Sequence, residues 1–240
     1  MDRLARFGVE AAVQVRPLSS KLVDWISRAT LTLNRSEVTS LPAGVTPFNI
    51  AQAGFGAGLG AFRIEPGKSA TEIVATIDKN GTLAVVGNGE PDFRIGWSNV
   101  VTAGDFTFSA LLDWQQGSDV INLTRLLYDG TSNSPDTAAA AKRLAAFGNG
   151  DPRPYIEDAS FVKLRELSVT YRLPKHIVAQ LAPLKTLDFA LSGRNLLTLT
   201  HYSGLDPEVS NFGIQSIGRN YDVAPYPPSR TYWLSITAGI

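Results

Sequence analysis

The sequence predicts an all-β fold: an antiparallel, up-and-down sheet of long strands that forms a segment of a transmembrane β-barrel. Three observations lead to this prediction. Apolar and polar residues alternate with period two in about seven segments, these segments are longer than ordinary strands, and the connections between them alternate between short and long. Each strand of such a barrel presents one face to hydrocarbon and the other to a polar interior.

The alternating segments follow one another along the whole chain. In the fifth, for example, Leu167, Val169 and Tyr171 alternate with polar residues. The predicted strands are residues 9–16, 25–34, 93–102, 106–115, 161–173, 187–195 and 231–240. Most of them span about 9 to 12 residues, whereas strands of globular proteins average about 5 to 6 and a tilted membrane strand needs roughly 9 to 11. Their length favours a membrane barrel over a β-sandwich.

Aromatic residues support the same interpretation. Those on the apolar faces, mostly near strand ends, are Trp25, Trp97, Trp114, Tyr171 and Tyr232. Transmembrane barrels carry such residues as girdles at the two membrane interfaces. In the alternative interpretation these are core aromatics of a soluble β protein.

The connections give an independent pattern. The short ones are residues 17–22, 102–105 and 173–185, and the long ones, rich in Gly, Pro, Asn and Asp, are residues 35–92, 117–160 and 199–228. Outer-membrane barrels have short periplasmic turns on one rim and long extracellular loops on the other. The parity therefore predicts a C-terminus on the periplasmic rim. Within the connections, short helices are expected at 134–148, which has a Ser/Asp start, and at 174–184, with Pro174 in the first turn.

Composition excludes several classes of protein. Lys and Arg together number 22, as do Asp and Glu, so there is no electrostatic basis for binding nucleic acid. The chain has no cysteine, which excludes disulfides and thiolate metal sites. Its first residues, MDRLARFGVEAAV, have neither an apolar core nor a small-residue cleavage site, and no signal peptide is expected there.

Three motifs that suggest chemistry are better explained as loops. The Gly-Lys-Ser of residues 67–69 resembles a phosphate-binding loop, but that motif needs a glycine where the chain has Phe62. The glycine-rich GFGAGLG of residues 54–60 lacks the dinucleotide-binding spacing. His176 and His201, the only histidines, lie in different connections, so neither a metal cluster nor a catalytic triad is expected. No catalytic, metal or cofactor-binding residue is assigned, and the substrate-binding residues stay unknown.

Asp206 and Glu208 flank Pro207 after the sixth strand, and their side chains are expected to point the same way. Such a pair is compatible with the two carboxylates of a glycosidase or with a calcium-binding loop. The favoured interpretation is structural, in which Asp-Pro fixes a turn where the strand leaves the sheet.

Three segments near the C-terminus resemble one known family. They are ASFVKLRELSVTYRLP followed by a short helix, SGRNLLTLTHYSGLDPE, and YPPSRTYWLSI. In this order they look like the C-terminal end of the SusC/RagA-type TonB-dependent outer-membrane receptors, and the upstream hairpins are similar to earlier hairpins of that family. In the family, GLDPE marks the exit of a strand into an extracellular loop.

The resemblance implies that residues 1–240 are the C-terminal part of a receptor β-barrel of roughly 22 strands. Such receptors import oligosaccharides or peptides through the outer membrane. The expected partners are the remainder of the barrel and its plug, a SusD-like lipoprotein, the TonB complex acting through the plug, and outer-membrane lipid. The chain shows no plug domain, and by itself it is not expected to transport, to bind a cofactor or to act as an enzyme.

A second hypothesis is a soluble or surface-attached carbohydrate-binding β-sandwich. It requires protein, and not lipid, to bury the apolar residues Leu167, Val169, Leu234 and Ile236. In a receptor of the resembled family, ligand contacts would come from the plug, the loops and the lid. Aromatic residues of the long connections are then expected either to stack on sugars or to pack the loops together, and they are Phe55, Tyr155, Tyr221 and Tyr226.

Overall fold

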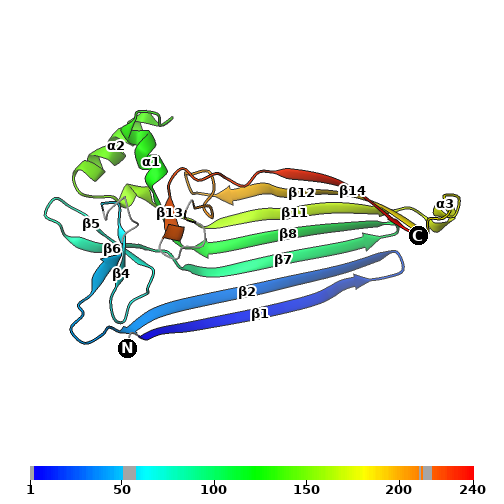
Figure 1. Ribbon diagram of the computed structural model, residues 1–240, viewed down its shortest axis with the longest axis horizontal. Coiled ribbons are helices and arrows are strands. Elements are labelled where there is room, and N and C mark those ends of the chain that lie inside the picture. Colours follow the sequence, from blue (N-terminus) through cyan, green and yellow to red (C-terminus); the bar gives the residue numbers. More distant parts are fainter. Residues whose placement is uncertain (1–2, 51–57, 211, 213–217) are drawn as a thin grey trace.

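A seven-stranded antiparallel sheet, here called the wall, dominates the molecule (Figure 1). The computed structural model describes residues 3–50, 58–210, 212 and 218–240. Each strand of the wall pairs with the next long strand of the chain. The strands are β1 (Arg3–Ser19), β2 (Val23–Ser40), β7 (Pro91–Ala103), β8 (Phe106–Gly117), β11 (Phe161–Arg172), β12 (Thr186–Thr200) and β14 (Thr231–Gly239). This order confirms the predicted up-and-down arrangement.

The first two strands extend beyond their predicted ends. Strand β1 has 17 residues and β2 has 18, more than the alternating pattern indicated. The alternation in β2 stops near Leu33, but the polar residues after it continue as a strand because they stay paired with β1. Arg35 contacts Asp92 at 2.8 Å, and the backbone N–H of Ser36 donates to Glu90 at 3.0 Å, so polar contacts hold this extension. Period-two alternation therefore marks only the part of the strand that has an apolar face.

The two rims of the wall differ as predicted. The tight turns at residues 20–22 and 104–105 and the compact 173–185 segment lie at one end of the strands, and the long connections lie at the other (Figure 1). The C-terminus lies at the rim of short turns. Gly104, with φ of +58°, occupies the left-handed conformation that the two-residue turn requires. The predicted 174–184 helix is shorter: α3 covers only Lys175–Val178, and Pro174 is its N-cap and not part of its first turn.

The outer face of the wall is apolar and uncovered. Leu167, Leu234 and Ile236 have relative exposures of 48%, 74% and 61%, and Val169 is half-buried. The β-sandwich hypothesis required protein to cover this face, and in the described part of the chain the wall is a single layer with no second sheet packed against it. The apolar stripe is suited to contact with hydrocarbon.

Aromatic residues cluster on the outer face near both rims. Phe106 and Tyr171 lie near the short turns with ring centroids 4.7 Å apart, and Phe93 and Trp114 lie near the long connections at 4.9 Å. Their positions agree with the predicted interfacial girdles.

On the same outer face, two tryptophans donate hydrogen bonds to a pair of polar residues. Ser27 and Asn99 lie directly opposite each other on β2 and β7. The indole N–H of Trp97 donates to Ser27 Oγ at 2.9 Å, and that of Trp25 donates to Asn99 Oδ1 at 3.0 Å. Each polar side chain thus keeps a hydrogen bond in a surface that is otherwise apolar.

The long connections fold together into a second unit, here called the cap, which the sequence did not predict. One connection forms a four-stranded sheet, and the others supply a three-stranded sheet and two helices. The elements are β3 (Phe48–Ile50), β4 (Ala61–Ile64), β5 (Glu72–Thr76), β6 (Leu83–Asn88), β9 (Asp119–Asn122), α1 (Leu123–Gly130), α2 (Thr137–Gly148), η1 (Arg153–Tyr155), β10 (Ile156–Asp158), η2 (Gly218–Asn220) and β13 (Tyr221–Asp222).

Of the cap helices, α2 confirms the prediction at 134–148, whereas α1 was missed. Helix α1 begins directly after strand β9, and Asn122 Oδ1 caps it by accepting a hydrogen bond from the backbone N–H of Arg125 at 2.8 Å. A helix of eight residues is too short for a clear period in the sequence. Within the described ranges, none of the helices has the length and apolar character needed to cross a membrane.

The cap has its own hydrophobic core, built from all three long connections. Its buried residues are Leu59, Phe62, Ile73, Ile121, Leu123, Tyr155 and Tyr221. Gly60, with φ of +129°, brings β4 close to this core, where a Cβ would lie 3.2 Å from the side chain of Ile73. The Tyr221 hydroxyl donates to the carbonyl of Gly60 at 3.0 Å, which ties the last connection to the first. Tyr155 and Tyr221 therefore pack the loops together; Tyr226 is 93% exposed, and Phe55 lies outside the described residues.

Candidate functional site: an ion cluster between wall and cap

The carboxylates of the GLDPE turn bind one lysine on the inner face of the wall. Strand β12 ends at Thr200, and the turn then brings Asp206 and Glu208 back to β11. Lys163 Nζ lies 2.6 and 2.8 Å from the two carboxylate oxygens of Asp206 and 2.7 Å from Glu208. The Lys163 side chain is only 4% exposed. This geometry agrees with a structural role for the turn, which the sequence favoured. It adds a second part to that role, because the turn also anchors its loop to the wall.

Three further charged side chains join this contact. Glu208 lies 2.8 Å from Arg94 and 2.6 Å from Arg165, and Asp113 lies 2.6 Å from each of these arginines. Together the six residues form the ion cluster: Arg94, Asp113, Lys163, Arg165, Asp206 and Glu208. Three cations face three carboxylates, so the cluster is formally neutral. The ring of Phe161 lies beneath it, with Lys163 Nζ 4.8 Å and the Arg165 guanidinium 5.5 Å from its centroid.

The register of the wall places these groups side by side. Lys163 on β11 pairs directly with Asp113 on β8. A β-bulge between Leu164 and Glu166 adds one residue to β11, which resets the alternation so that Leu164 and Leu167 both face outward. Arg165 occupies the bulge and reaches the cluster. The bulge also explains why the alternation in this segment is regular only after Glu166.

The electrostatics of the turn do not fit a catalytic or metal-binding pair. Burial raises the pKa of Glu208, but hydrogen bonds from Lys163 and Arg165 outweigh it and hold that pKa below its ordinary value. A glycosidase acid requires the opposite shift. The carboxylates already bind protein cations, and the described residues contain no group of three or more His, Cys, Asp or Glu side chains suited to a metal. His176 and His201 lie on opposite rims of the wall.

The glycine-containing motifs lie in the cap. The Gly-Lys-Ser of residues 67–69 forms part of the turn between β4 and β5, where the N–H of Gly67 donates to Val38 at 2.7 Å. Its role there is to join the cap to the end of β2. Of the GFGAGLG segment, only residues 58–60 lie within the described ranges.

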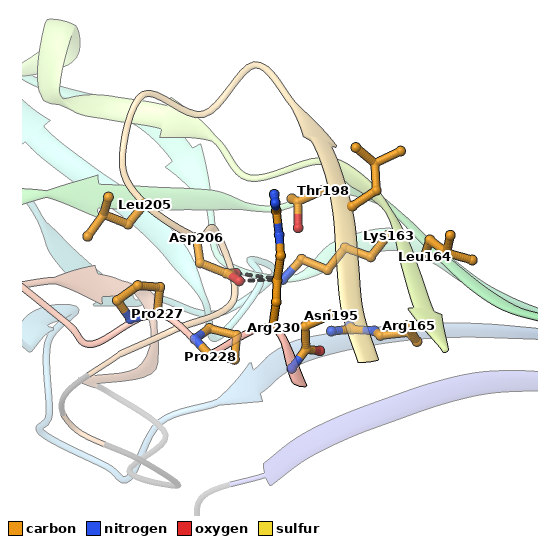
Figure 2. A pocket seen from close by; sticks show the side chains of 11 residues that line it. Lys163, Leu164, Arg165, Asn195, Thr198, Leu205, Asp206, Pro227, Pro228 and Arg230 are labelled. Carbon is orange, nitrogen blue, oxygen red and sulfur yellow. Dashed lines mark hydrogen bonds and ion pairs between the residues drawn. The ribbon is translucent and has the colours of Figure 1, made fainter. Parts of the chain in front are cut away.

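Three cavities surround the ion cluster. One of about 250 Å³ is bordered by Lys163, Arg165 and Asp206 (Figure 2). A second of about 370 Å³ on the inner face of the wall is bordered by Arg94, Asp113 and Arg165. The third, of about 450 Å³, lies between wall and cap and is bordered by Arg94 and Glu208. The cluster thus holds the last loop on the wall and presents charge to any solute that enters these spaces.

A second charged group lies inside the cap. Asp129 on α1 accepts hydrogen bonds from Arg143 at 2.7 Å and from the Tyr155 hydroxyl at 2.9 Å, and it also contacts Ser134. The hydrogen bonds from Arg143 outweigh the opposing effect of burial and lower the pKa of Asp129 to about 2. This network fixes α1 against α2 and the cap core.

Sequence reasoning found only part of the site. It singled out Asp206 and Glu208 but missed the four wall residues of the ion cluster. A usable signal was present: charged side chains stood at inward positions of β7, β8 and β11 close to the long connections. Which inward charges meet depends on the register between strands, and a single strand does not specify its register.

The chain is similar to known proteins in sequence and in fold. It is 30% identical to TonB-dependent receptor P3 of Formosa agariphila over 185 residues, which cover 69% of the chain and 18% of that protein. It is 28% identical to TonB-dependent receptor P26 of the same organism over 183 residues, covering 68% of the chain and again 18% of the relative. The chain therefore spans under a fifth of the length of these curated relatives. No family model matches.

Solved structures of the RagAB peptide importer share the fold. In the open-open state the TM-score is 0.71 with 19% sequence identity, and the match covers 100% of this chain and 29% of the other. In the closed-closed state the TM-score is 0.69, with 98% of this chain covered. At this level of identity the likeness concerns the fold alone.

Proposed function

Because the chain is related to the TonB-dependent receptors and resembles the SusC/RagA type, we propose that it forms part of the barrel of an outer-membrane nutrient importer. Residues 1–240 would be the C-terminal part of that barrel, which would have roughly 22 strands. The short turns would face the periplasm, and the cap would face the outside of the cell. The nutrient would be an oligosaccharide or a peptide.

The observation that carries this proposal is the uncovered apolar outer face of the wall. Leu234, at 74% exposure, sits between Trp233 and Ser235 on the last strand, and no described residue covers it. A surface of this kind costs about 25 cal/mol for each Å² left in water, so a wall of long strands needs hydrocarbon on that side. Polar side chains and the ion cluster occupy the inner face, as a barrel lumen requires.

The proposed partners are those of the SusC/RagA-type receptors that the chain resembles. The outer edges of β1 and β14 have no neighbouring strand among the described residues, and we expect the remainder of the barrel to pair with them. A plug inside the barrel would contact the polar inner face and receive force from the TonB complex. A SusD-like lipoprotein would close over the cap. In this assembly the ion cluster would keep the 201–230 loop fixed on the wall while the nutrient passes.

Site-directed spin labelling of the receptor that contains this chain tests the proposal. The chain has no cysteine, so single cysteines can be introduced without removing others. A nitroxide at Leu234→Cys should be accessible to oxygen dissolved in lipid and protected from a water-soluble nickel complex. The adjacent Ser235→Cys is the matched control and should show the reverse, because neighbouring strand residues face opposite sides.

Orientation is tested on intact cells. A membrane-impermeant maleimide should label Leu205→Cys, which is 70% exposed in a long loop, without permeabilisation. It should label Ile240→Cys only after the outer membrane is opened. Equal water accessibility at Leu234→Cys and Ser235→Cys, or labelling of Ile240→Cys on intact cells, would rule out the proposed membrane arrangement.

A further inference from the structure

Strand β12 has a free backbone edge above the start of β14. The pairing of β14 with β12 runs only from Thr186 to Arg194 of β12. Beyond that point β12 continues to Thr200, where it pairs with β11 on its other side. From Asn195 to Thr200 no strand among the described residues occupies the edge that faces away from β11. This free edge is near the rim of long connections.

The chain that leads into β14 cannot complete the sheet here. Residues 225–228 read Pro-Tyr-Pro-Pro, and proline has no backbone N–H to donate to a ladder. The contact that joins this segment to β12 is a hydrogen bond from the Asn195 side chain to the carbonyl of Ser229 at 3.1 Å. Asn195 itself has φ of +53°, which interrupts the regular strand at the level where β14 ends its pairing. The segment therefore stands beside the edge and leaves a gap.

The cavity of about 250 Å³ shown in Figure 2 borders this gap and also reaches residues of β11 and of the GLDPE turn. Asn195 and Thr198 of β12 form one side, and Pro227, Pro228 and Arg230 form the other. Drug-sized ligands occupy pockets of about 300–1,000 Å³, so this space suits a short stretch or the end of a larger molecule. Among the described residues that line it there is no aromatic side chain, which does not favour a sugar ring that binds by stacking.

Within the described part of the chain, one positive charge that lines the cavity has no protein partner. Lys163 and Arg165, which also line it, are engaged with the carboxylates of the ion cluster. Arg230 makes no ion pair or hydrogen bond within the described residues, and in Figure 2 its side chain extends across the pocket. Because the ion cluster is formally neutral, Arg230 supplies a net charge of +1. A carboxylate is the group that matches a free guanidinium in charge and shape.

We propose that this notch binds an extended, carboxylate-bearing peptide segment. The peptide backbone pairs with the free edge of β12 between Asn195 and Thr200, and a peptide carboxylate pairs with Arg230. An extended peptide repeats its N–H and C=O groups at the spacing of a strand edge, which a sugar chain does not. The inference rests on the proposed import function and narrows the nutrient of that importer to acidic peptides.

The test measures peptide binding to the receptor that contains this chain, purified from outer membranes in detergent. The probe is a fluorescein-labelled Ala-Glu-Ala-Glu-Ala peptide, compared with its lysine counterpart and with a version N-methylated at alternate residues. The acidic peptide should bind at least tenfold more tightly than either comparison peptide, because one loses the carboxylate and the other the backbone donors.

Variants locate the site. Arg230→Gln should weaken binding of the acidic peptide about tenfold or more and should abolish its advantage over the lysine peptide. Thr198→Pro should weaken both peptides by disturbing the edge. The matched control is Arg172→Gln, which removes an exposed arginine at the opposite rim and should leave affinity unchanged.

Several results would overturn the inference. One is equal binding of the acidic, lysine and N-methylated peptides, and another is an unchanged affinity in Arg230→Gln. A third is tight binding of a trigalacturonate oligosaccharide without binding of any peptide. If the spin labels report the proposed membrane arrangement while these results hold, only the peptide notch fails. If the labels contradict that arrangement, the import function itself fails.

Discussion

The wall and the cap bury their apolar residues against different surroundings. In the cap, Ile73 and Ile121 have no exposed surface at all, and residues from three connections cover each other. In the wall, apolar residues of similar size such as Leu191 and Leu234 are 53% and 74% exposed. The cap therefore buries its apolar residues inside the protein, whereas the wall leaves them uncovered, as the proposed contact with a bilayer requires.

The difference shows that successive segments of one chain can place their apolar residues in two ways, either on an outer surface or inside a protein core. Strand by strand, the wall leaves its apolar side chains on an uncovered outer face, and most of its charged groups turn inward. Each long connection then leaves this environment and contributes a few residues to a core that no single connection could form alone. The ion cluster joins the two units, since Asp206 and Glu208 belong to a cap connection and Lys163 to the wall.

Large-to-small substitutions should give the largest difference in stability between the cap and the wall. Phe62→Ala in the cap core should lower the free energy of unfolding of the cap by about 3–5 kcal/mol, because the lost contacts leave a cavity in protein. Leu191→Ala on the wall should cost clearly less, because lipid chains fill the vacated space. Hydrogen exchange of the cap and the wall, each measured in both variants, makes the comparison. Equal costs at the two sites would show that protein also covers the wall.

Introducing a charge should lower the stability of the barrel on the outer face of the wall but not on the inner face. Leu234→Arg, near the middle of β14, should destabilise the barrel by about 2–4 kcal/mol because the guanidinium enters hydrocarbon. Ser235→Arg on the inner face should change stability little. Urea unfolding in lipid vesicles, followed by the mobility shift of the folded barrel on gels, measures both. A similar loss in the two variants would contradict the assignment of the faces.

Acid should weaken the cap while the outer contacts of the wall persist. The pKa of Asp129 is lowered to about 2, so its ion pair with Arg143 contributes stability above the unfolded-state pKa near 3.8. That contribution, about 2 kcal/mol, is lost as pH falls from about 4 towards 2. Hydrogen exchange in α1 and α2 should increase over this range, and in Asp129→Asn the pH dependence should be smaller. An identical pH dependence in the variant would show that protonation of Asp129 does not cause the loss of cap stability in acid.

The smallest effect is expected where wall and cap meet. Glu208→Gln removes one charge from the ion cluster but keeps a hydrogen-bond acceptor, so the attachment of the loop should weaken by about 1.5 kcal/mol, the low end for a hydrogen bond to a charged group. Hydrogen exchange in residues 201–210 should report it. The matched variant Glu166→Gln removes a carboxylate that pairs with Arg194 at the surface of the wall, and it should leave that loop unaffected. Release of the loop in both variants would mean that the cluster is not a specific anchor.

The wall could be predicted from the sequence because its signal is local. Alternation, strand length and the order of connection lengths all lie in consecutive residues, and each reports the same two-faced sheet. The extension of β2 beyond Leu33 could not be read in this way, since its polar residues become a strand only through pairing with β1.

The cap could not be predicted because its elements depend on contacts between distant segments. Tyr221 reaches Gly60 across 161 positions of sequence, and β13 pairs in parallel with β9, from a different connection. The short helix α1 and strands of two to six residues have little period of their own. For the same reason the partners of Asp206 and Glu208 stayed hidden although the two carboxylates themselves stood out.

The shared core of the cap has a consequence for how such a protein can acquire new ligand preferences. Loops that are independent of one another can be lengthened, shortened or exchanged one at a time. Here, transplanting one connection from a homologue would bring side chains shaped for absent neighbours: Tyr221 without Gly60, or Ile73 without Ile121. Evolution and protein engineering alike would have to change the three connections as a set.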